Sequence, residues 1–296
     1  MGSAPPTEPL VGCVYVCLDP GVPAFGSKGC SVHVQEVLRR LVDRTRAGAV
    51  HLVVARTGGP APRGLDGVVV HELGRPAGAG AAEREQQLLA LDQRAAALVE
   101  RLVVGLVEGH GTTGGGAPVL VHQRYGLWSA AVLERAAAAG ARTVLEVNAP
   151  LVLEQTQHRE LVDVEGATAT TRRAVRAAAG SGAVVAVSGA VAAWVLAETG
   201  CPAVVVPNGV DLDRFAPPDR APGALARPGV FTTAFVGGFR PWHGTSSLVE
   251  AVADVDRVLR GGGGGGAAPG RAGLLLVGDG PERAGVLAAA ARAGLP

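Results

Sequence analysis

Short apolar runs alternate with amphipathic stretches along most of the chain. Seven such runs lie before Pro207, at 11–18, 50–55, 68–73, 118–122, 143–147, 183–187 and 203–207. Runs of this length, bounded by turn residues, are typical of buried strands. Between them, Val34, Val37, Leu38 and Leu41 recur at helical spacing and predict a helix over 31–46. The alternation predicts an α/β fold in which the seven strands form one mostly parallel sheet.

The pattern changes after Pro207. Residues 208–229 are rich in Pro, Gly and charge, which is typical of a linker. A new cycle follows, with strands at 231–238 and 273–278, a helix over 245–260, a glycine loop at 261–266 and a final helix. We therefore predict domains over 1–207 and 230–296, joined by 208–229. Two strands are too few for a doubly wound sheet, so we expect the second domain to be incomplete at Pro296.

Composition limits the partners and the compartment. The 27 Lys and Arg residues nearly balance the 26 Asp and Glu residues, which argues against a broad basic surface for nucleic acid. The four cysteines lack the spacing of a zinc site or a disulfide framework, and the N-terminus does not resemble a secretory signal. We expect a cytoplasmic protein, with peripheral contact at the inner membrane face left open.

One uncharged stretch, 177–197, has the length of a membrane-spanning helix. Gly180, Gly182 and Gly189 interrupt it, and alanine outnumbers leucine. We expect a buried strand, a turn and a helix there, and no membrane span.

A glycine-rich loop follows the first predicted strand and leads into the first helix. Backbone N–H groups at a helix N-terminus attract anions, and glycine lets the backbone come close to them. Gly26, Lys28 and Gly29 are therefore candidates for binding a phosphate. The alternative is a flexible connection between strand and helix.

The second domain repeats this arrangement. Gly237 and Gly238 end a strand, Arg240 and His243 follow, and Thr245 or Ser246 is placed to cap the next helix. An ordinary turn with a surface arginine is the alternative. A further turn with Gly278 and Gly280 follows the last strand; these glycines either approach a nucleotide or only form the turn.

Polar residues close two strands of the first domain. His122 ends one apolar run and Arg124 follows it, while Glu146 and Asn148 close the next run. Open α/β sheets bind ligands outside the carboxyl ends of their strands, so these four residues are predicted to line one rim. The seven histidines show no pair at metal-binding spacing, and no metal is expected.

Seven segments in register resemble the retaining glycosyltransferases of family 4. They are GSKGCSVHVQEV, RYGLWS, LEVNAPLVLEQTQHREL, VVAVSGAVAAWV, VPNGVDLDRF, VGGFRPWHG and LVGDGPE. The resemblance implies the GT-B fold, with two Rossmann-like, doubly wound domains. It also implies metal-independent transfer of a sugar, with retained anomeric configuration and no cofactor, from a UDP- or GDP-linked donor to a glycan, lipid-linked or small-molecule acceptor.

The resemblance also suggests roles for residues. Gly26, Lys28 and Gly29 would border the diphosphate and the acceptor. The loop from Gly237 to Gly244 would bind the donor phosphates, with Gly278 and Gly280 beside it. Glu146 and Asn148 would lie on the acceptor side. Catalysis would be mainly electrostatic, so Arg240, His243, His122 and Arg124 are the candidate catalytic residues.

Three departures from the family pattern keep alternatives open. Gly238 and His243 stand where many relatives have Arg and Lys, and Arg124 stands where relatives often have His. A pair of glutamates that holds the donor in the family would lie beyond Pro296. We therefore expect the 296-residue chain alone to bind UDP or GDP poorly and to transfer no sugar. The alternatives are an inactive remnant, a module that binds an acceptor or partner, and an epimerase, for which the sequence shows no acid and base pair.

Overall fold

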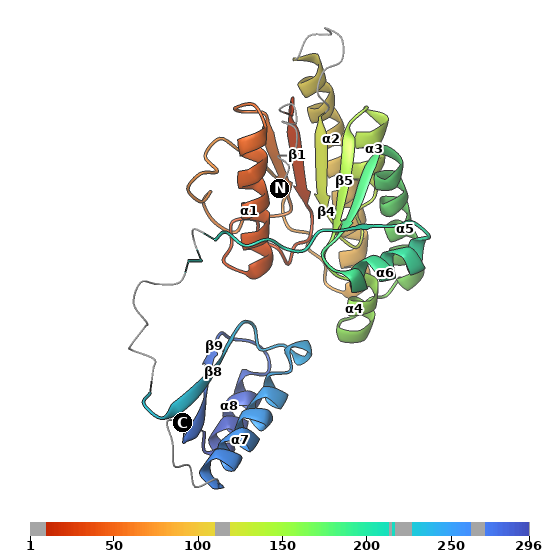
Figure 1. Ribbon diagram of the computed structural model, residues 1–296. Coiled ribbons are helices and arrows are strands. Elements are labelled where there is room, and N and C mark those ends of the chain that lie inside the picture. The colour runs from red at the N-terminus through yellow and green to blue at the C-terminus, as the bar shows by residue number, and fades with distance from the viewer. Residues whose placement is uncertain (1–9, 110–118, 213–214, 217–226, 262–269, 296) are drawn as a thin grey trace. The chain divides into compact units, whose positions relative to one another are not determined.

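The computed structural model describes residues 10–109, 119–212, 215–216, 227–261 and 270–295. The chain divides into two compact units, Met1–Asp211 (unit 1) and Leu212–Pro296 (unit 2) (Figure 1). Part of the predicted linker, most of the glycine loop predicted at 261–266, Pro118 of the fourth predicted strand, and the two chain ends lie outside the described residues.

Unit 1 contains one sheet of seven parallel strands, in the order β3-β2-β1-β4-β5-β6-β7. The prediction of seven strands in one sheet is confirmed. The last strand is shorter than predicted, because β7 lies at the sheet edge and pairs only with β6 through two residues. The strands are β1 (Cys13–Cys17), β2 (Val50–Val54), β3 (Val69–Glu72), β4 (Leu120–Arg124), β5 (Arg142–Val147), β6 (Gly182–Ala186) and β7 (Val204–Val205).

Helices cover both faces of this sheet (Figure 1). On one face, Val34 and Leu38 of α1 (Gly29–Arg44) pack against Tyr15 of β1 and Leu52 of β2. On the other face lie α2 (Ala81–Glu108), α3 (Ala131–Ala138), α5 (Val164–Ser181) and α6 (Gly189–Thr199). A short helix, α4 (Leu151–His158), follows β5. Burial of the apolar stripe of each helix against the sheet stabilises this layered arrangement.

The uncharged stretch 177–197 forms the end of α5, strand β6 and most of α6. Gly182 begins β6 where a Cβ atom would lie 1.9 Å from the carbonyl oxygen of Thr143, so only glycine lets the two strands pair there. Within the described part of the chain, no helix combines the length and the apolar character needed to cross a membrane.

Unit 2 has a parallel pair of strands, β8 (Val230–Val236) and β9 (Arg271–Val277). The 3-10 turn η1 (Pro241–His243) leads into α7 (Thr245–Gly261), and α8 (Arg283–Ala293) follows β9. Buried Asp256 of α7 accepts hydrogen bonds from Arg260 Nε at 2.8 Å, from Arg271 Nε at 2.7 Å and from the Ala272 amide at 2.9 Å. This carboxylate ties α7 to the start of β9.

Candidate functional site

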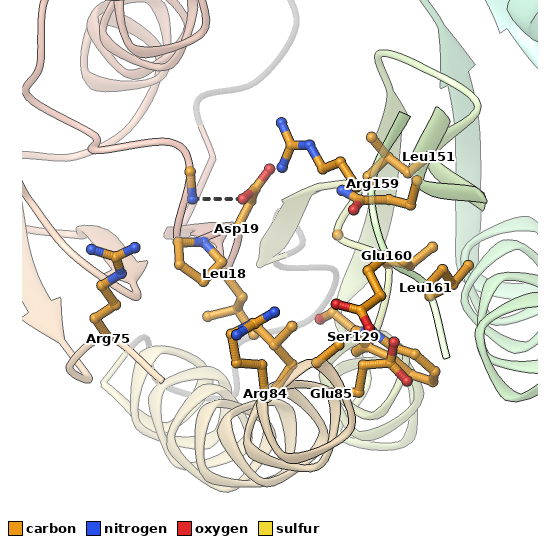
Figure 2. Close-up of a pocket in the computed structure, with 18 residues that line it drawn as sticks. Leu18, Asp19, Arg75, Arg84, Glu85, Ser129, Leu151, Arg159, Glu160 and Leu161 are labelled. Carbon is orange, nitrogen blue, oxygen red and sulfur yellow. Dashed lines mark hydrogen bonds between the residues drawn. The ribbon is translucent and has the colours of Figure 1, made fainter. Parts of the chain in front are cut away.

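A pocket opens where the strand order of unit 1 reverses. Strand β1 has β2 on one side and β4 on the other. The chain segments that follow β1 and β4 therefore leave the sheet in different directions at its carboxyl edge. Such a switch point is where open α/β sheets bind ligands. The cavity has a volume of about 280 Å³ (Figure 2). It is lined by the segments 18–21 after β1 and 126–129 after β4, and by residues of α2, α4 and the segment 159–161.

Asp92 of α2 holds one wall of this pocket. Its carboxylate is 3% exposed and accepts hydrogen bonds from Ser129 Oγ at 2.8 Å and from the amides of Ala130 and Ala131 at 3.1 and 2.8 Å. Gln123 of β4 donates to the Ser129 carbonyl from the same side at 3.0 Å. Burial raises the pKa of Asp92, and the hydrogen bonds at the N-terminus of α3 partly offset that effect. The loop after β4 is therefore held in place by hydrogen bonds with Asp92 of α2 and Gln123 of β4.

Replacing Asp92 by asparagine tests this support. The amide group donates where the carboxylate accepts, so at least one buried N–H group loses its partner. We expect Asp92→Asn to lower the free energy of unfolding by about 1–3 kcal/mol. Denaturant unfolding measures this loss. Asp43→Asn is the matched control, because Asp43 is exposed and forms only a 3.5 Å ion pair with Arg40; an equal loss in both variants would contradict the supporting role.

Glu85 of α2 holds another wall. Its carboxylate is buried and accepts hydrogen bonds from the amides of Val162 at 2.8 Å and Asp163 at 3.1 Å. It lies two helical turns before Asp92, so both carboxylates project from one face of α2. Neither Glu85 nor Asp92 was predicted from the sequence to support a site. The signal that could have identified them is the presence of acidic residues among the apolar positions that α2 repeats at helical spacing.

Three arginines line the same pocket from separate segments. Arg75 follows β3, Arg84 belongs to α2 and Arg159 directly follows α4. Figure 2 shows their side chains around Leu18 and Asp19. In this view, Arg84 and Arg159 lie on opposite sides of Asp19. No described residue forms a hydrogen bond or ion pair with any of the three guanidinium groups. These three residues could not be predicted as a group from the sequence, because nothing in their spacing relates one to another.

Glu146 is the centre of a second polar cluster, on the α1 side of the sheet. Its carboxylate accepts hydrogen bonds from His122 Nε2 at 3.0 Å and Asn148 Nδ2 at 2.5 Å, and Arg124 Nη1 lies 3.5 Å away. The four polar residues predicted for one rim are thus brought together. A fifth member, His33 of α1, donates to Glu146 from 2.6 Å and was missed, because it precedes Glu146 by 113 residues.

The charge of Glu146 is strongly stabilised. Burial by itself would raise the pKa of Glu146, but the hydrogen bonds from His122 and His33 outweigh it and hold the pKa well below its usual range. Tyr15 of β1 stacks on His122 with ring centroids 5.0 Å apart, and its own hydroxyl is buried without a partner. Both oxygens of Glu146 accept hydrogen bonds, Oε1 from His33 and Asn148 and Oε2 from His122, so the carboxylate orients its neighbours.

The predicted phosphate loop before α1 is held in place. Gln35 Nε2 donates to the carbonyl of Gly26 at 2.9 Å, and a Cβ atom on Gly26 would lie 2.7 Å from the ring of Pro23. Gly29 begins α1 and faces open space, Lys28 is exposed, and its side chain makes no capping hydrogen bond. The structure therefore favours a fixed loop over a flexible one. Gly26 serves the turn itself, and Gly29 and Lys28 are accessible to a ligand.

The turn after β8 carries the predicted phosphate-binding residues of unit 2. The carbonyl of Gly238 can only accept, so the His243 Nδ1 atom that contacts it carries the hydrogen. Nε2 is then the ring nitrogen of His243 that is left for a ligand. Arg240 is exposed, with its guanidinium carbon 6.0 Å from the Trp242 ring centroid. Among the candidates in this turn, Arg240 is the one that presents a permanent positive charge.

The start of α7 differs from the prediction in one respect. The helix begins at Thr245, whose hydroxyl is buried and has no hydrogen-bond partner, so this residue does not cap the helix. Leu248 donates to the carbonyl of Gly244, whose φ of 63° places it in the left-handed region that favours glycine.

Gly278 and Gly280 let the turn after β9 pack closely against the turn after β8. A Cβ atom on Gly278 would lie 1.8 Å from the carbonyl oxygen of Gly237, and one on Gly280 would lie 2.5 Å from that of Phe239. The Gly237 amide donates to the Val277 carbonyl at 2.9 Å. Both glycines thus fulfil a packing requirement within unit 2, which explains their presence without a ligand.

Together, these features provide local sites for anions and polar groups. Unit 1 has the pocket at the strand switch point, and unit 2 has Arg240 beside the N-terminus of α7. Within the described segments, no group of three or more His, Cys, Asp and Glu side chains is arranged to hold a metal ion.

Comparison with known proteins gives a family and a fold. The model of Glycosyltransferase Family 4 matches residues 27–214. The structure resembles the crystal structure of Anabaena Alr3699/HepE in complex with UDP, with a TM-score of 0.56 at 15% identity over 96% of this chain. It also matches a UDP-glucosyltransferase from Polygonum tinctorium in a complex with 3,4-dichloroaniline, with a TM-score of 0.49 at 13% identity over 98% of this chain and 80% of the other. This chain covers 66% of the Anabaena chain. No curated protein matches it.

Proposed function

The chain belongs to glycosyltransferase family 4, and from this premise we propose that it transfers a sugar from a nucleotide-sugar donor to an acceptor. The α/β fold agrees, because the Anabaena structure that it resembles is a GT-B-like match and was solved in complex with UDP. In this proposal unit 1 binds the acceptor and unit 2 binds the nucleotide. The observation that carries the proposal is the family match over residues 27–214.

The pocket of unit 1 supports the acceptor role. It lies outside the carboxyl ends of β1 and β4, and buried hydrogen bonds of Asp92 and Glu85 hold its walls in place. A preformed site of this kind lets an acceptor bind without ordering the loops first. His122 and Arg124 are oriented by Glu146 at the same edge of the sheet and are proposed to act on the reacting groups.

The turn of unit 2 supports the donor role. Arg240 and the N-terminus of α7 together offer positive charge to a diphosphate. As the bond to the sugar breaks, negative charge grows on the leaving diphosphate, and fixed cations and N–H groups stabilise it. This chemistry requires no metal ion, and we propose metal-independent transfer with retained anomeric configuration. UDP is the first donor nucleotide to test, because UDP is bound in the Anabaena structure.

A donor screen tests the proposal. UDP- and GDP-linked sugars are incubated with the full-length protein, acceptor candidates and a chelator, and release of the nucleotide is followed. We expect release from one donor class in the presence of chelator, and a product whose anomeric configuration, read by NMR, equals that of the donor. Inverted configuration or a strict need for metal would contradict the finer proposal. Binding of an acceptor without any transfer would favour a binding module.

A further inference from the structure

Three unpaired arginines converge on the pocket of unit 1. Arg75, Arg84 and Arg159 all line it, and none has a hydrogen-bonding or ionic partner within the described parts of the chain. Their source in three different segments is visible in Figure 2. All three side chains are exposed, so their guanidinium donors are open to an anion that enters the pocket.

Three carboxylates, those of Asp19, Glu85 and Glu160, also line the pocket and balance the formal charge of the arginines, but none of them forms an ion pair with these arginines. Both oxygens of Glu85 accept backbone hydrogen bonds from the segment before α5. Asp19 accepts a hydrogen bond from the Gly21 amide at 2.7 Å. Glu160 is exposed and forms no ion pair with a described arginine. The guanidinium groups therefore keep their donors available for a ligand.

We infer that this pocket binds the phosphate group of a phosphorylated acceptor. The inference rests on the proposed function, in which unit 1 holds the acceptor. A phosphate ester has several terminal oxygens and up to two negative charges, which matches three forked donors better than the two oxygens of a carboxylate do. Leu18, Leu88 and Trp128 supply apolar and aromatic surface for the body of the acceptor.

The size of the pocket limits what it holds. At about 280 Å³ it lies at the small end of ligand sites. It has room for the head of an acceptor, such as a sugar or polyol phosphate. The same chemistry occurs on a free sugar phosphate and on the head group of a phospholipid, and the experiment separates these sources.

Calorimetry with matched probes tests the inference. Glucose 6-phosphate and glycerol 3-phosphate are titrated into the protein, each beside its unphosphorylated counterpart, and glucuronate serves as the carboxylate probe. We expect the phosphorylated probes to bind at least about tenfold more tightly than the others, since hydrogen bonds to charged groups carry most of the affinity. Arg84→Ala should weaken them by about tenfold or more, and Arg84→Glu should abolish binding.

Arg94→Ala is the matched control, because Arg94 is an exposed residue of the same helix, and it does not line the pocket. It removes one positive charge from α2 and should leave the affinity unchanged. Equal weakening in both variants, equal binding of glucuronate, or no preference for phosphorylated probes would overturn the inference. Circular dichroism of each variant confirms that the fold is retained.

A second arm identifies the source of the phosphate. Co-sedimentation with phosphatidylcholine vesicles is compared with and without phosphatidic acid. Arg84-dependent binding only to the acidic vesicles indicates a lipid-linked acceptor, and binding only to the soluble probes indicates a free phosphate ester. Absence of Arg84-dependent binding in both formats counts against the inference.

UDP titration of the full-length protein, beside the phosphate probes, keeps the two proposals apart. Failure of the phosphate probes with intact UDP binding rejects only the inference about the acceptor. Failure of UDP and GDP binding with intact, Arg84-dependent phosphate binding rejects the donor role of unit 2. The pocket of unit 1 would then remain an anion site.

Discussion

In the full-length protein, Arg240→Ala is expected to lower the rate of sugar transfer by about a hundredfold to a thousandfold, which corresponds to about 2.7–4 kcal/mol of transition-state stabilisation. The physical reason is that Arg240 presents a permanent charge beside the N-terminus of α7, where the diphosphate would leave. Steady-state kinetics measure the effect. The turnover number should fall while the acceptor KM stays unchanged, since the side chain acts on the leaving group.

Two further variants test whether the effect is specific to Arg240 and whether it depends on charge alone. Arg257→Ala removes an exposed arginine of α7 that pairs with Asp254 at 2.7 Å, and should leave turnover unchanged. Arg240→Lys keeps the charge but loses the forked donor and should recover part of the rate. Full activity of Arg240→Ala would reject the catalytic role of this residue and leave the turn with a structural role.

Glu146→Ala is expected to lower the free energy of unfolding by about 3–5 kcal/mol. The variant leaves His33, His122, Arg124 and Asn148 without the carboxylate that all four approach within 3.5 Å. Several donors and the partly buried positive charge of Arg124 then lack a partner. Denaturant unfolding measures the loss.

Glu134→Ala is the matched control, because Glu134 is partly exposed and pairs with the exposed Arg173. Such pairs contribute less than about 1 kcal/mol. If both variants lose the same stability, the cluster around Glu146 is no stronger than a surface pair.

The same carboxylate predicts a pH dependence of stability. The pKa of Glu146 in the folded chain lies below its ordinary value of 4.5, so the unfolded chain binds the proton more readily. The contribution of Glu146 is fully present above that ordinary value and is lost as the pH falls through the lower folded pKa. We expect Glu146→Gln to flatten the decline in unfolding free energy below about pH 4.5. An unchanged slope would show that other groups cause the acid sensitivity.

Much of the fold could be predicted because its signals are local. The apolar runs predict the seven strands of unit 1, and the spacing of Val34, Val37, Leu38 and Leu41 predicts α1. A run of apolar residues reports burial of that same segment, whatever its partners are. Strand length was less predictable, since pairing at the sheet edge limits β7 to two residues.

The rim of polar residues was predictable for a related reason. His122 and Glu146 end or nearly end strands, and parallel strands bring their carboxyl ends to one edge. His33 was not predictable, because only the packing of α1 on the sheet brings it to Glu146. The roles proposed for these residues in catalysis remain predictions.

The sequence by itself determined the α/β class, the order of elements and the family, because hydrophobic periodicity and motif spacing are properties of neighbouring positions. The tertiary structure alone decided which distant side chains share a site. The strand order places the segments after β1 and β4 around one pocket, and α2 adds Glu85 and Asp92 as supports for its walls. Crossover connections bring Arg75, Arg84 and Arg159 together there, and no local pattern encodes that convergence.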